Sequence, residues 1–172
     1  MKVKHPCHPR NPRLTESLRM QIVRAQPQDT EALTEIAHAA KRHWGYPERW
    51  IESWRETLTI RAEFIAANEA WCAMEDSRAV GFYLLTSESD GLHLDHLWVL
   101  PDAMGRGIGR ALFEHAVEQA RTLGHRILKI EADPNAEGFY ARMGARRVGE
   151  VVTEIEGQRR ELPLFLYELQ KQ

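Results

Sequence analysis

The feature that constrains this chain most is a set of three alternating glycines at the start of a segment with helical periodicity. Gly105, Gly107 and Gly109 lie in the stretch LWVLPDAMGRGIGRALFEHAVEQA, residues 97–120. Glycine loses more backbone entropy on folding than any other residue, so three of them together indicate positive φ angles or the close approach of another group. An apolar segment precedes them, and apolar residues repeat at helical spacing after them. The stretch therefore predicts a strand, a tight turn and a helix.

A glycine-rich turn at the beginning of a helix is suited to binding an anion. The first backbone N–H groups of a helix have no partner within the helix, and the helix dipole adds positive potential there. We therefore expect a phosphate at this turn; the alternative is a turn that only joins strand to helix. The dinucleotide motif GxGxxG is excluded because Arg110 stands where its last glycine is needed. A P-loop is excluded because no Gly-Lys-Ser/Thr follows.

Length and composition limit the classes of protein to which the chain can belong. Its 172 residues, 43% hydrophobic and 28% charged, suit one globular domain. The net charge of -2 provides no basic field for nucleic acid. An apolar run of about 18 residues, which a membrane span requires, does not occur. The N-terminal residues lack the apolar core of a secretory signal, and the two cysteines, Cys7 and Cys72, suit a reducing compartment. We therefore expect a cytoplasmic protein.

The N-terminal segment differs in composition from the rest of the chain. Residues 1–17 are rich in proline and charge, so we expect a flexible extension there and a single domain over residues 18–172. His5, Cys7 and His8 are metal-ligand types within this extension. Because no second ligand cluster lies beside them, we predict no metal site.

The order of the predicted elements indicates a mixed sheet covered by helices. Helices are predicted at 28–43, 47–58, 108–121 and 135–143, and strands at 18–25, 70–76, 79–89, 91–100, 126–133, 146–155 and 160–169. Residues 61–68 fit no single pattern. Two helices, a run of antiparallel strands and a β-α-β unit predict an α+β domain with three α/β/α layers. Its sheet is expected to be mixed and mostly antiparallel.

The order of these motifs resembles that of the GNAT superfamily, the acetyl-CoA-dependent N-acyltransferases, over about residues 18–169. Two separated signatures carry the resemblance. The stretch LWVLPDAMGRGIGRAL matches the family's cofactor motif of strand, loop and helix. The stretch DPNAEGFYARMGA looks like its second motif, a helix that bears a tyrosine and ends at a glycine. The resemblance implies the acyl-CoA N-acyltransferase fold and acetyl-CoA as the cofactor.

The resemblance also implies where acetyl-CoA binds. The pantetheine arm would pair with the backbone of residues 97–99 as an added strand, and N–H groups of residues 104–109 would surround the pyrophosphate. Arg106 and Arg110 either contact the phosphates or lie in solvent. Since the family usually has Arg or Gln where this chain has Met104, we expect weaker cofactor binding, with Arg106 as a compensating group. The predicted cofactor-binding residues are Leu97, Trp98, Val99, Met104, Gly105, Arg106, Gly107, Ile108, Gly109, Arg110, Asn135 and Tyr140.

Acetyl transfer to an amine requires an acid and a base. The amine, with a pKa of about 10, must lose a proton before it attacks, and the leaving thiolate, with a pKa of roughly 8.5, benefits from a proton donor. The resemblance implies Tyr140 as this general acid; packing of its ring in the core is the alternative. For the base it implies Glu131, with Asp95 and His96 as alternatives. Strand alternation predicts that Asp95 and His96 face opposite sides, so that at most one faces the site.

The family recognises its acceptor largely with the segment between the first two helices and with the last hairpin. The predicted acceptor-binding residues are His43, Trp44, Tyr46 and His96. The aromatic side chains of the helical segment, with Trp50, either wall a pocket or pack the helices together. Glu154 and Glu156 either attract a cationic amine or are solvated. These predictions place the acceptor between the two segments.

Together these observations predict an N-acetyltransferase in which a primary amine of a small molecule or peptide attacks acetyl-CoA directly. The alternative is a sensor or interaction module that binds coenzyme A without turnover, which Met104 favours and Tyr140 opposes. Transfer to aminoacyl-tRNA would need a basic face, which the net charge does not predict. Asn135 either caps the helix that follows it or contacts the cofactor arm. A homodimer is compatible with the resemblance.

Overall fold

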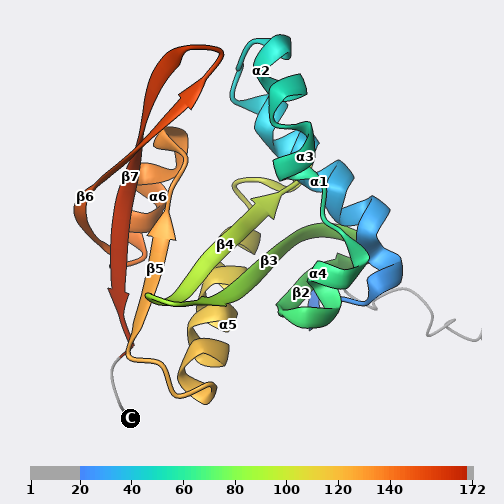
Figure 1. The fold of residues 1–172 in the computed structure, drawn as a ribbon. Helices are drawn as coiled ribbons and strands as arrows, with labels where there is room; N and C mark the ends of the chain where they lie inside the picture. The colour runs from blue at the N-terminus through green and yellow to red at the C-terminus, as the bar shows by residue number, and fades with distance from the viewer. Residues whose placement is uncertain (1–19, 170–172) are drawn as a thin grey trace, which may run out of the picture.

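Seven strands form one sheet in the computed structural model, which describes residues 20–169 (Figure 1). The extension predicted at 1–17 lies outside the described residues, and so do His5, Cys7 and His8. The strands are β1 (Gln21–Arg24), β2 (Glu69–Glu75), β3 (Arg78–Glu88), β4 (Gly91–Val99), β5 (Ile127–Glu131), β6 (Arg146–Ile155) and β7 (Gln158–Glu168). Their order is β1-β2-β3-β4-β5-β7-β6, and only the pair β4 and β5 is parallel. The prediction of a mixed, mostly antiparallel sheet is confirmed.

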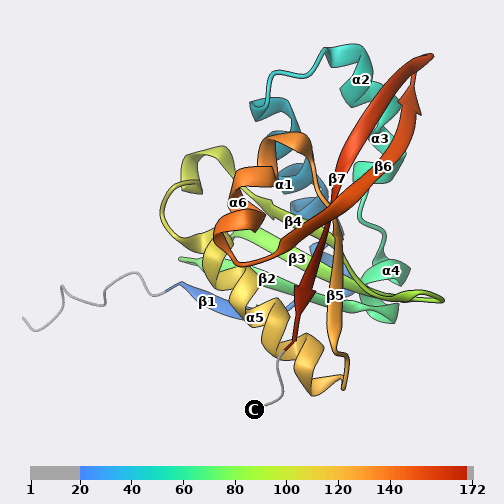
Figure 2. The same cartoon turned by 90° about the vertical axis from the view of Figure 1, so that its left-hand side faces the viewer.

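Helices cover both faces of the sheet, as predicted. They are α1 (Thr30–His43), α2 (Glu48–Ser53), α3 (Arg55–Leu58), α4 (Ala62–Ala67), α5 (Ile108–Thr122) and α6 (Glu137–Arg142). Side chains of β3 alternate between the two faces: Tyr83 and Leu85 pack in the cluster with α5, and Phe82 and Leu84 pack in the cluster with α1. Figure 2 shows α5 in front of the sheet and α1 behind it.

One helix was not predicted. Residues 61–68, which fitted no pattern, contain α4, a helix of 6 residues with no side-chain cap. Ile65 is its only buried residue. A helix this short spans fewer than two turns, so no apolar repeat can develop in its sequence.

The glycine turn has the predicted strand-turn-helix form, and its three glycines differ in role. Gly105 and Gly107 have φ angles of +74° and +85°, a region that residues with a Cβ rarely adopt. Gly107 is the N-cap of α5. Gly109 lies within α5 without a positive φ, and a Cβ there would be 3.5 Å from the ring of Phe139. Backbone conformation therefore requires two glycines, and the third lies where α5 meets α6.

The sheet opens between β4 and β5. The two strands pair at Leu92↔Leu128 and His93↔Lys129 and then diverge (Figure 1). A bulge in β4 follows directly: Leu85 of β3 pairs with Leu94, whereas Leu84 pairs with His96, so Asp95 is the extra residue. The backbone of β4 beyond the bulge is therefore paired with β3 on one side and lacks β5 on the other.

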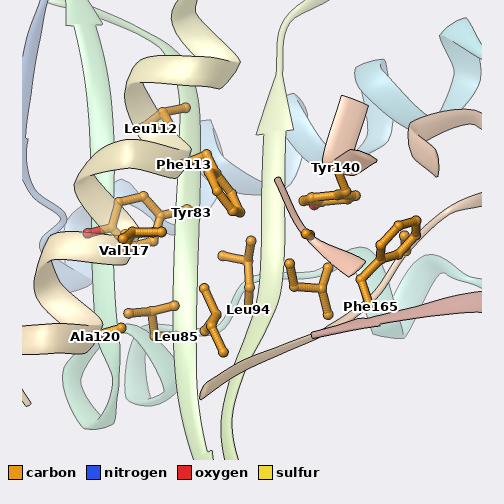
Figure 3. Packing of buried hydrophobic residues seen from close by; sticks show 14 of the residues in the cluster. Tyr83, Leu85, Leu94, Leu112, Phe113, Val117, Ala120, Tyr140 and Phe165 are labelled. Atoms are coloured by element: carbon orange, nitrogen blue, oxygen red, sulfur yellow. The ribbon is translucent and has the colours of Figure 1, made fainter. Parts of the chain in front are cut away.

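An aromatic cluster fixes α6 against α5 and the end of the sheet (Figure 3). The ring of Phe113, 2% exposed, lies edge-to-face with Phe139, Tyr140 and Tyr167, at centroid distances of 6.2, 6.0 and 5.3 Å. Burial of one such ring contributes about 1.5–3 kcal/mol, and favourable ring geometry adds to this. The cluster thus holds the helix that carries Tyr140 in a fixed place.

Candidate functional site

Two pockets meet where β4 and β5 diverge. The first, of about 600 Å³, lies against the glycine turn and α6; we call it the glycine-side pocket. The second, of about 1320 Å³, lies between α2, α3 and the β6-β7 hairpin; we call it the hairpin-side pocket. Residues that line both pockets are Leu94, Asp95, Trp98, Glu131 and Asp133. A reaction between a molecule in each pocket would take place beside these residues.

The glycine-side pocket gathers most of the predicted cofactor-binding residues. Those that line it are Leu97, Trp98, Val99, Met104, Gly105, Gly107, Gly109, Arg110, Asn135 and Tyr140. The side chain of Ile108 is 3% exposed and belongs to the core, so only its backbone is available to a ligand. Because Gly105 and Gly107 have no side chain, the N–H groups at the beginning of α5 are open to an anion.

The arginines near this turn differ from the prediction. Arg106 does not line the pocket: its Nη2 donates to Oε1 of Glu75 at 2.7 Å. Arg142, which was not predicted, does line it, next to Gly138. A Cβ on Gly138 would lie 3.3 Å from Nη1 of Arg142, so the glycine makes room for the guanidinium. The spacing of four residues between them on one helix was the available signal. Arg110 and Arg142 are therefore the cationic side chains of this pocket.

Tyr140 belongs to the core and also reaches the pocket, so its position is compatible with both roles that the sequence left open. Its ring packs against Phe113, Phe139 and Phe165 and is 6% exposed, yet the residue lines the glycine-side pocket (Figure 3). Burial raises the pKa of Tyr140 well above its usual value, and the negative charge of Asp133 adds to the increase. The phenol therefore stays protonated at neutral pH, and its hydroxyl is able to donate a hydrogen bond.

The prediction that Asp95 and His96 face opposite sides is wrong. Oδ2 of Asp95 lies 3.3 Å from Nε2 of His96, and both residues line the hairpin-side pocket. The bulge at Asp95 breaks the strand alternation on which the prediction rested. Asp95 also lines the glycine-side pocket, as does Glu131 at the end of β5, whose Oε1 lies 3.9 Å from Nζ of Lys129. Both candidate carboxylates thus stand at the junction.

His96 is held in its neutral form. Nε1 of Trp98 donates to Nδ1 of His96 at 3.0 Å, so Nδ1 carries no proton and the ring proton is on Nε2, facing Asp95. Burial lowers the pKa of His96, although the charge of Asp95 opposes the shift. With Nδ1 occupied and Nε2 protonated, His96 presents an N–H group toward Asp95 and has no free ring nitrogen to act as a base.

A buried carboxylate that the sequence did not indicate lies beside the junction. Asp133 is 8% exposed; its Oδ2 accepts from Nζ of Lys41 at 2.5 Å, and its Oδ1 accepts from the hydroxyl of Tyr46 at 2.9 Å. Burial alone would raise the pKa of Asp133, but the charge and hydrogen bond of Lys41, with bonds from Asn135 and Tyr46, hold it below its usual value. Lys41 stands at the apolar spacing of α1, with Ala37 and Ala40, which was the available signal.

For Asn135 the sequence predicted either a cap of the following helix or a contact with the cofactor arm, and the structure shows a third role. The residue lines the glycine-side pocket, but it does not cap α6. Its Nδ2 donates to the Tyr46 hydroxyl and to Oδ1 of Asp133, both at 3.0 Å. The capping bond of this turn is made instead by Asp133, which accepts from the backbone N–H of Asn135 at 3.0 Å. Asn135 thus fixes the turn between β5 and α6.

The aromatic residues predicted to bind the acceptor are divided. Trp44 lines the glycine-side pocket, on the other side of the junction from the expected acceptor, and His43 lines neither pocket and packs edge-on against Trp44. Tyr46 stacks on Trp50 at 6.0 Å and meets Trp54 edge-on at 5.2 Å, behind the pocket wall. For these rings, packing of the helices is the better description. Trp54, which was not predicted, lines the hairpin-side pocket, as does His96.

One cluster in residues 20–169 has the ligand types of a metal site. Glu88, Asp90 and His93 bring their ligand atoms together at the turn between β3 and β4. The cation of Lys129, however, donates to Oδ2 of Asp90 at 2.7 Å, and Nε2 of His93 lies 2.7 Å from Oδ1. These contacts already satisfy the carboxylate of Asp90.

None of the helices within residues 20–169 is long and apolar enough to cross a membrane.

Comparison with known proteins adds independent findings. Residues 30–159 match the family described as Acetyltransferase (GNAT) domain. The chain is 36% identical over 111 residues to the Peptidyl-lysine N-acetyltransferase YjaB of Salmonella typhimurium, which covers 64% of this chain and 71% of that protein. Two crystal structures share the fold. A GCN5-related N-acetyltransferase from Rhodopseudomonas palustris has a TM-score of 0.77 at 24% identity, covering 87% of this chain and 96% of that one. The PaiA N-acetyltransferase of Thermoplasma acidophilum, in complex with coenzyme A, has a TM-score of 0.71 at 20% identity, covering 87% and 99%.

Proposed function

Because the chain belongs to the GNAT family of N-acetyltransferases, we propose that it transfers the acetyl group of acetyl-CoA to the ε-amine of a lysine in a peptide or protein. The enzyme class and the cofactor follow from the family: the chain is an acyltransferase that uses acetyl-CoA. The lysine acceptor is the proposal. It is supported by the relative in Salmonella typhimurium, which is named for that activity, and by the charge of the hairpin-side pocket.

The observation that carries the proposal is the position of Asp95 and Glu131 at the junction of the two pockets. Carboxylates there attract an ammonium group and are able to take its proton. Further acidic side chains line the larger pocket around them: Glu56, Glu63, Glu88, Glu154 and Glu156. This composition favours a cationic acceptor such as a lysine side chain over a neutral or anionic one.

Acetyl-CoA supplies the thioester carbonyl that the amine attacks. In the proposed mechanism Asp95 or Glu131, directly or through a water, takes a proton from the ammonium and leaves a nucleophilic amine. The C–N bond forms and the C–S bond breaks, and the hydroxyl of Tyr140 gives its proton to the leaving sulfur. The second proton of the attacking nitrogen passes through water to the phenolate, and the carboxylate releases the first proton to solvent. Nε2 of His96 lies 3.3 Å from Oδ2 of Asp95, so its N–H group faces that carboxylate.

An assay of acetyl transfer to peptides tests the proposal. The protein is incubated with acetyl-CoA and a lysine peptide whose N-terminus is blocked, and thiol release is followed together with the peptide mass. We expect equimolar free thiol and a single acetyl group on the lysine. The matched control is the same peptide with norleucine in place of lysine. Acetyl-CoA binding without thiol release, across a panel of lysine peptides and small amines, would favour the sensor over the enzyme.

A further inference from the structure

Arg160 of β7 is a nearly buried cation on the wall of the hairpin-side pocket. Its side chain is 12% exposed, and the residue lines that pocket. The guanidinium lies over the rings of Trp54 and Tyr46, at 4.7 and 5.4 Å from their centroids. Its Nη2 donates to the Tyr46 hydroxyl at 3.2 Å. The aromatic rings thus fix the orientation of the planar guanidinium on the wall of the hairpin-side pocket.

The nearest carboxylate is already saturated. Oδ1 of Asp133 accepts from the Tyr46 hydroxyl and from the N–H and Nδ2 of Asn135, and Oδ2 accepts from Lys41. Nη2 of Arg160 lies 3.8 Å from Oδ2, which is an ion pair without a direct hydrogen bond. Asp133 therefore compensates Lys41 first and Arg160 only in part.

The charge of this cluster does not balance. Lys41 and Arg160 are two cations at 9% and 12% exposure, and they share one carboxylate. Within residues 20–169 no other carboxylate is in ion-pair contact with Arg160; Glu156 in the same pocket pairs instead with Arg49 at 2.8 Å. The only hydrogen bond of the Arg160 guanidinium within residues 20–169 is the one to Tyr46, so its other N–H groups are available to an anionic ligand in the pocket.

We propose that Arg160 is a specificity residue that binds a carboxylate of the acceptor. This inference rests on the proposed function and names its substrate class: a lysine with an acidic residue beside it. Asp133 lines both pockets and contacts Arg160, so the guanidinium lies near the junction where the amine reacts. Asp95 and Glu131 attract the ammonium of such a substrate, while the planar guanidinium binds its carboxylate with two parallel hydrogen bonds.

The test compares matched peptides on the parent protein and on variants. Lysine peptides with Asp, Asn or Arg beside the lysine are ranked by kcat/KM, and we expect the Asp peptide to exceed the Asn peptide by about tenfold. A second pair, Nα-acetyl-lysine and its amide, distinguishes a terminal carboxylate from a side-chain one. In Arg160→Gln the Asp/Asn ratio should fall to about one, and in Arg160→Lys, which keeps the charge without the planar fork, it should be intermediate.

Arg159→Gln is the matched control. Arg159 is adjacent in sequence, its side chain is 67% exposed, and it pairs with Glu161 at 2.9 Å, so its loss should leave the ratio unchanged. Because each ratio is internal to one protein, a partial loss of folded enzyme does not alter it. A ratio below about twofold in the parent, or one retained in Arg160→Gln, overturns the inference.

Binding separates this inference from the proposed function. Trp54 lies against Arg160, so peptide binding can be followed by tryptophan fluorescence without turnover. Preferential binding of the Asp peptide without acetyl transfer would keep the carboxylate site and reject the lysine acetyltransferase. Equal acetylation and equal binding of the Asp and Asn peptides would keep the enzyme and reject the site. Tightest binding of the Arg peptide would mean that the acidic lining alone selects the substrate.

Discussion

The two pockets are built in opposite ways, although they share a wall. The glycine-side pocket is formed by two short stretches of chain, residues 94–110 and 131–143, with only two contributions from α1 and its C-terminal end. The anion site predicted there consists mostly of main chain at the beginning of α5. The hairpin-side pocket is formed by residues of α1 to α4, of β3 to β7 and of the loops between them, from Lys41 to Leu162. Local backbone therefore specifies the first pocket, and long-range pairing of charges specifies the second.

The largest expected effect tests whether main chain is what binds the cofactor. Gly107→Glu should reduce acetyl-CoA affinity beyond detection, because the new carboxylate would occupy and repel the position of the phosphates. Calorimetry with acetyl-CoA measures it. Gly124→Glu is the matched control, since Gly124 has a similar φ of +81°, also faces open space, and lies at the far end of α5. Equal losses in the two variants would attribute the effect to backbone strain alone.

The next effect tests whether the other pocket depends on buried charge. Asp133→Asn should lower the free energy of unfolding by about 3 kcal/mol at neutral pH, because it leaves Lys41 and Arg160 without a carboxylate. Urea denaturation measures the change. The matched control is Asp90→Asn at an exposed ion pair, where Asp90 is 52% exposed and bonds Lys129, and where the change should be much smaller.

The pH dependence of this difference has a definite sign. The pKa of Asp133 is lowered on folding, so its stabilising contribution is complete above the usual pKa of an aspartate, about 3.9. It is lost as the pH falls through the lowered pKa of the folded state. Parent and Asp133→Asn should therefore converge in stability under strongly acidic conditions. A gap that stays constant through that range would mean that the charge of Asp133 does not stabilise the fold.

A third effect lies in the glycine-side pocket. Tyr140→Phe keeps the ring in its aromatic cluster and removes the proton donor, so kcat should fall by roughly 10²-fold with little change in acetyl-CoA affinity. Single-acceptor kinetics on the folded variant measures it. Tyr83→Phe removes another buried hydroxyl, one that bonds Nδ1 of His115 at 2.7 Å away from both pockets, and should leave kcat unchanged. If kcat of Tyr140→Phe stays within about twofold of the parent, Tyr140 is only a packing residue.

A smaller effect separates the two arginines near the glycine turn. Arg142→Gln should weaken acetyl-CoA binding by roughly tenfold, the scale of one charge-assisted hydrogen bond, because Arg142 lines the glycine-side pocket. Arg106→Gln should leave the affinity unchanged, because Arg106 bonds Glu75. The reverse order would restore the prediction made from the sequence.

The smallest effect is a gain. Met104 lines the glycine-side pocket where the family usually has a polar residue, so Met104→Arg should tighten acetyl-CoA by about 1 kcal/mol. Leu123→Arg adds the same charge at an exposed position after α5 and should have no such effect. Unchanged or weaker binding in Met104→Arg would mean that the new guanidinium does not reach the phosphates.

The contrast also explains what the sequence predicted. The strand, glycine turn and helix were predictable because each depends on residues within a few positions of one another, as does the turn at Gly144. The pairing of Asp95 with His96 was not, because the bulge depends on the register of β3. The bond from Arg106 to Glu75 and the cluster of Lys41, Asp133 and Arg160 join segments far apart in the chain. Such contacts follow from tertiary packing and leave no repeat in the sequence.

The short parallel ladder between β4 and β5 has a consequence for how the domain opens. The sheet consists of two halves, one made of β1, β2, β3 and β4 and the other of β5, β7 and β6. Only two residue pairs, between β4 and β5, join these halves through the main chain. Without cofactor, the two halves are held by the core beneath α5 and by the Asp133 cluster, and we expect them to open as separate units in hydrogen exchange. A cofactor arm paired along residues 97–99 would add contacts between the two halves and make them unfold together. Acetyl-CoA would then also contribute to the stability of the fold, and its concentration would determine how cooperatively the domain unfolds.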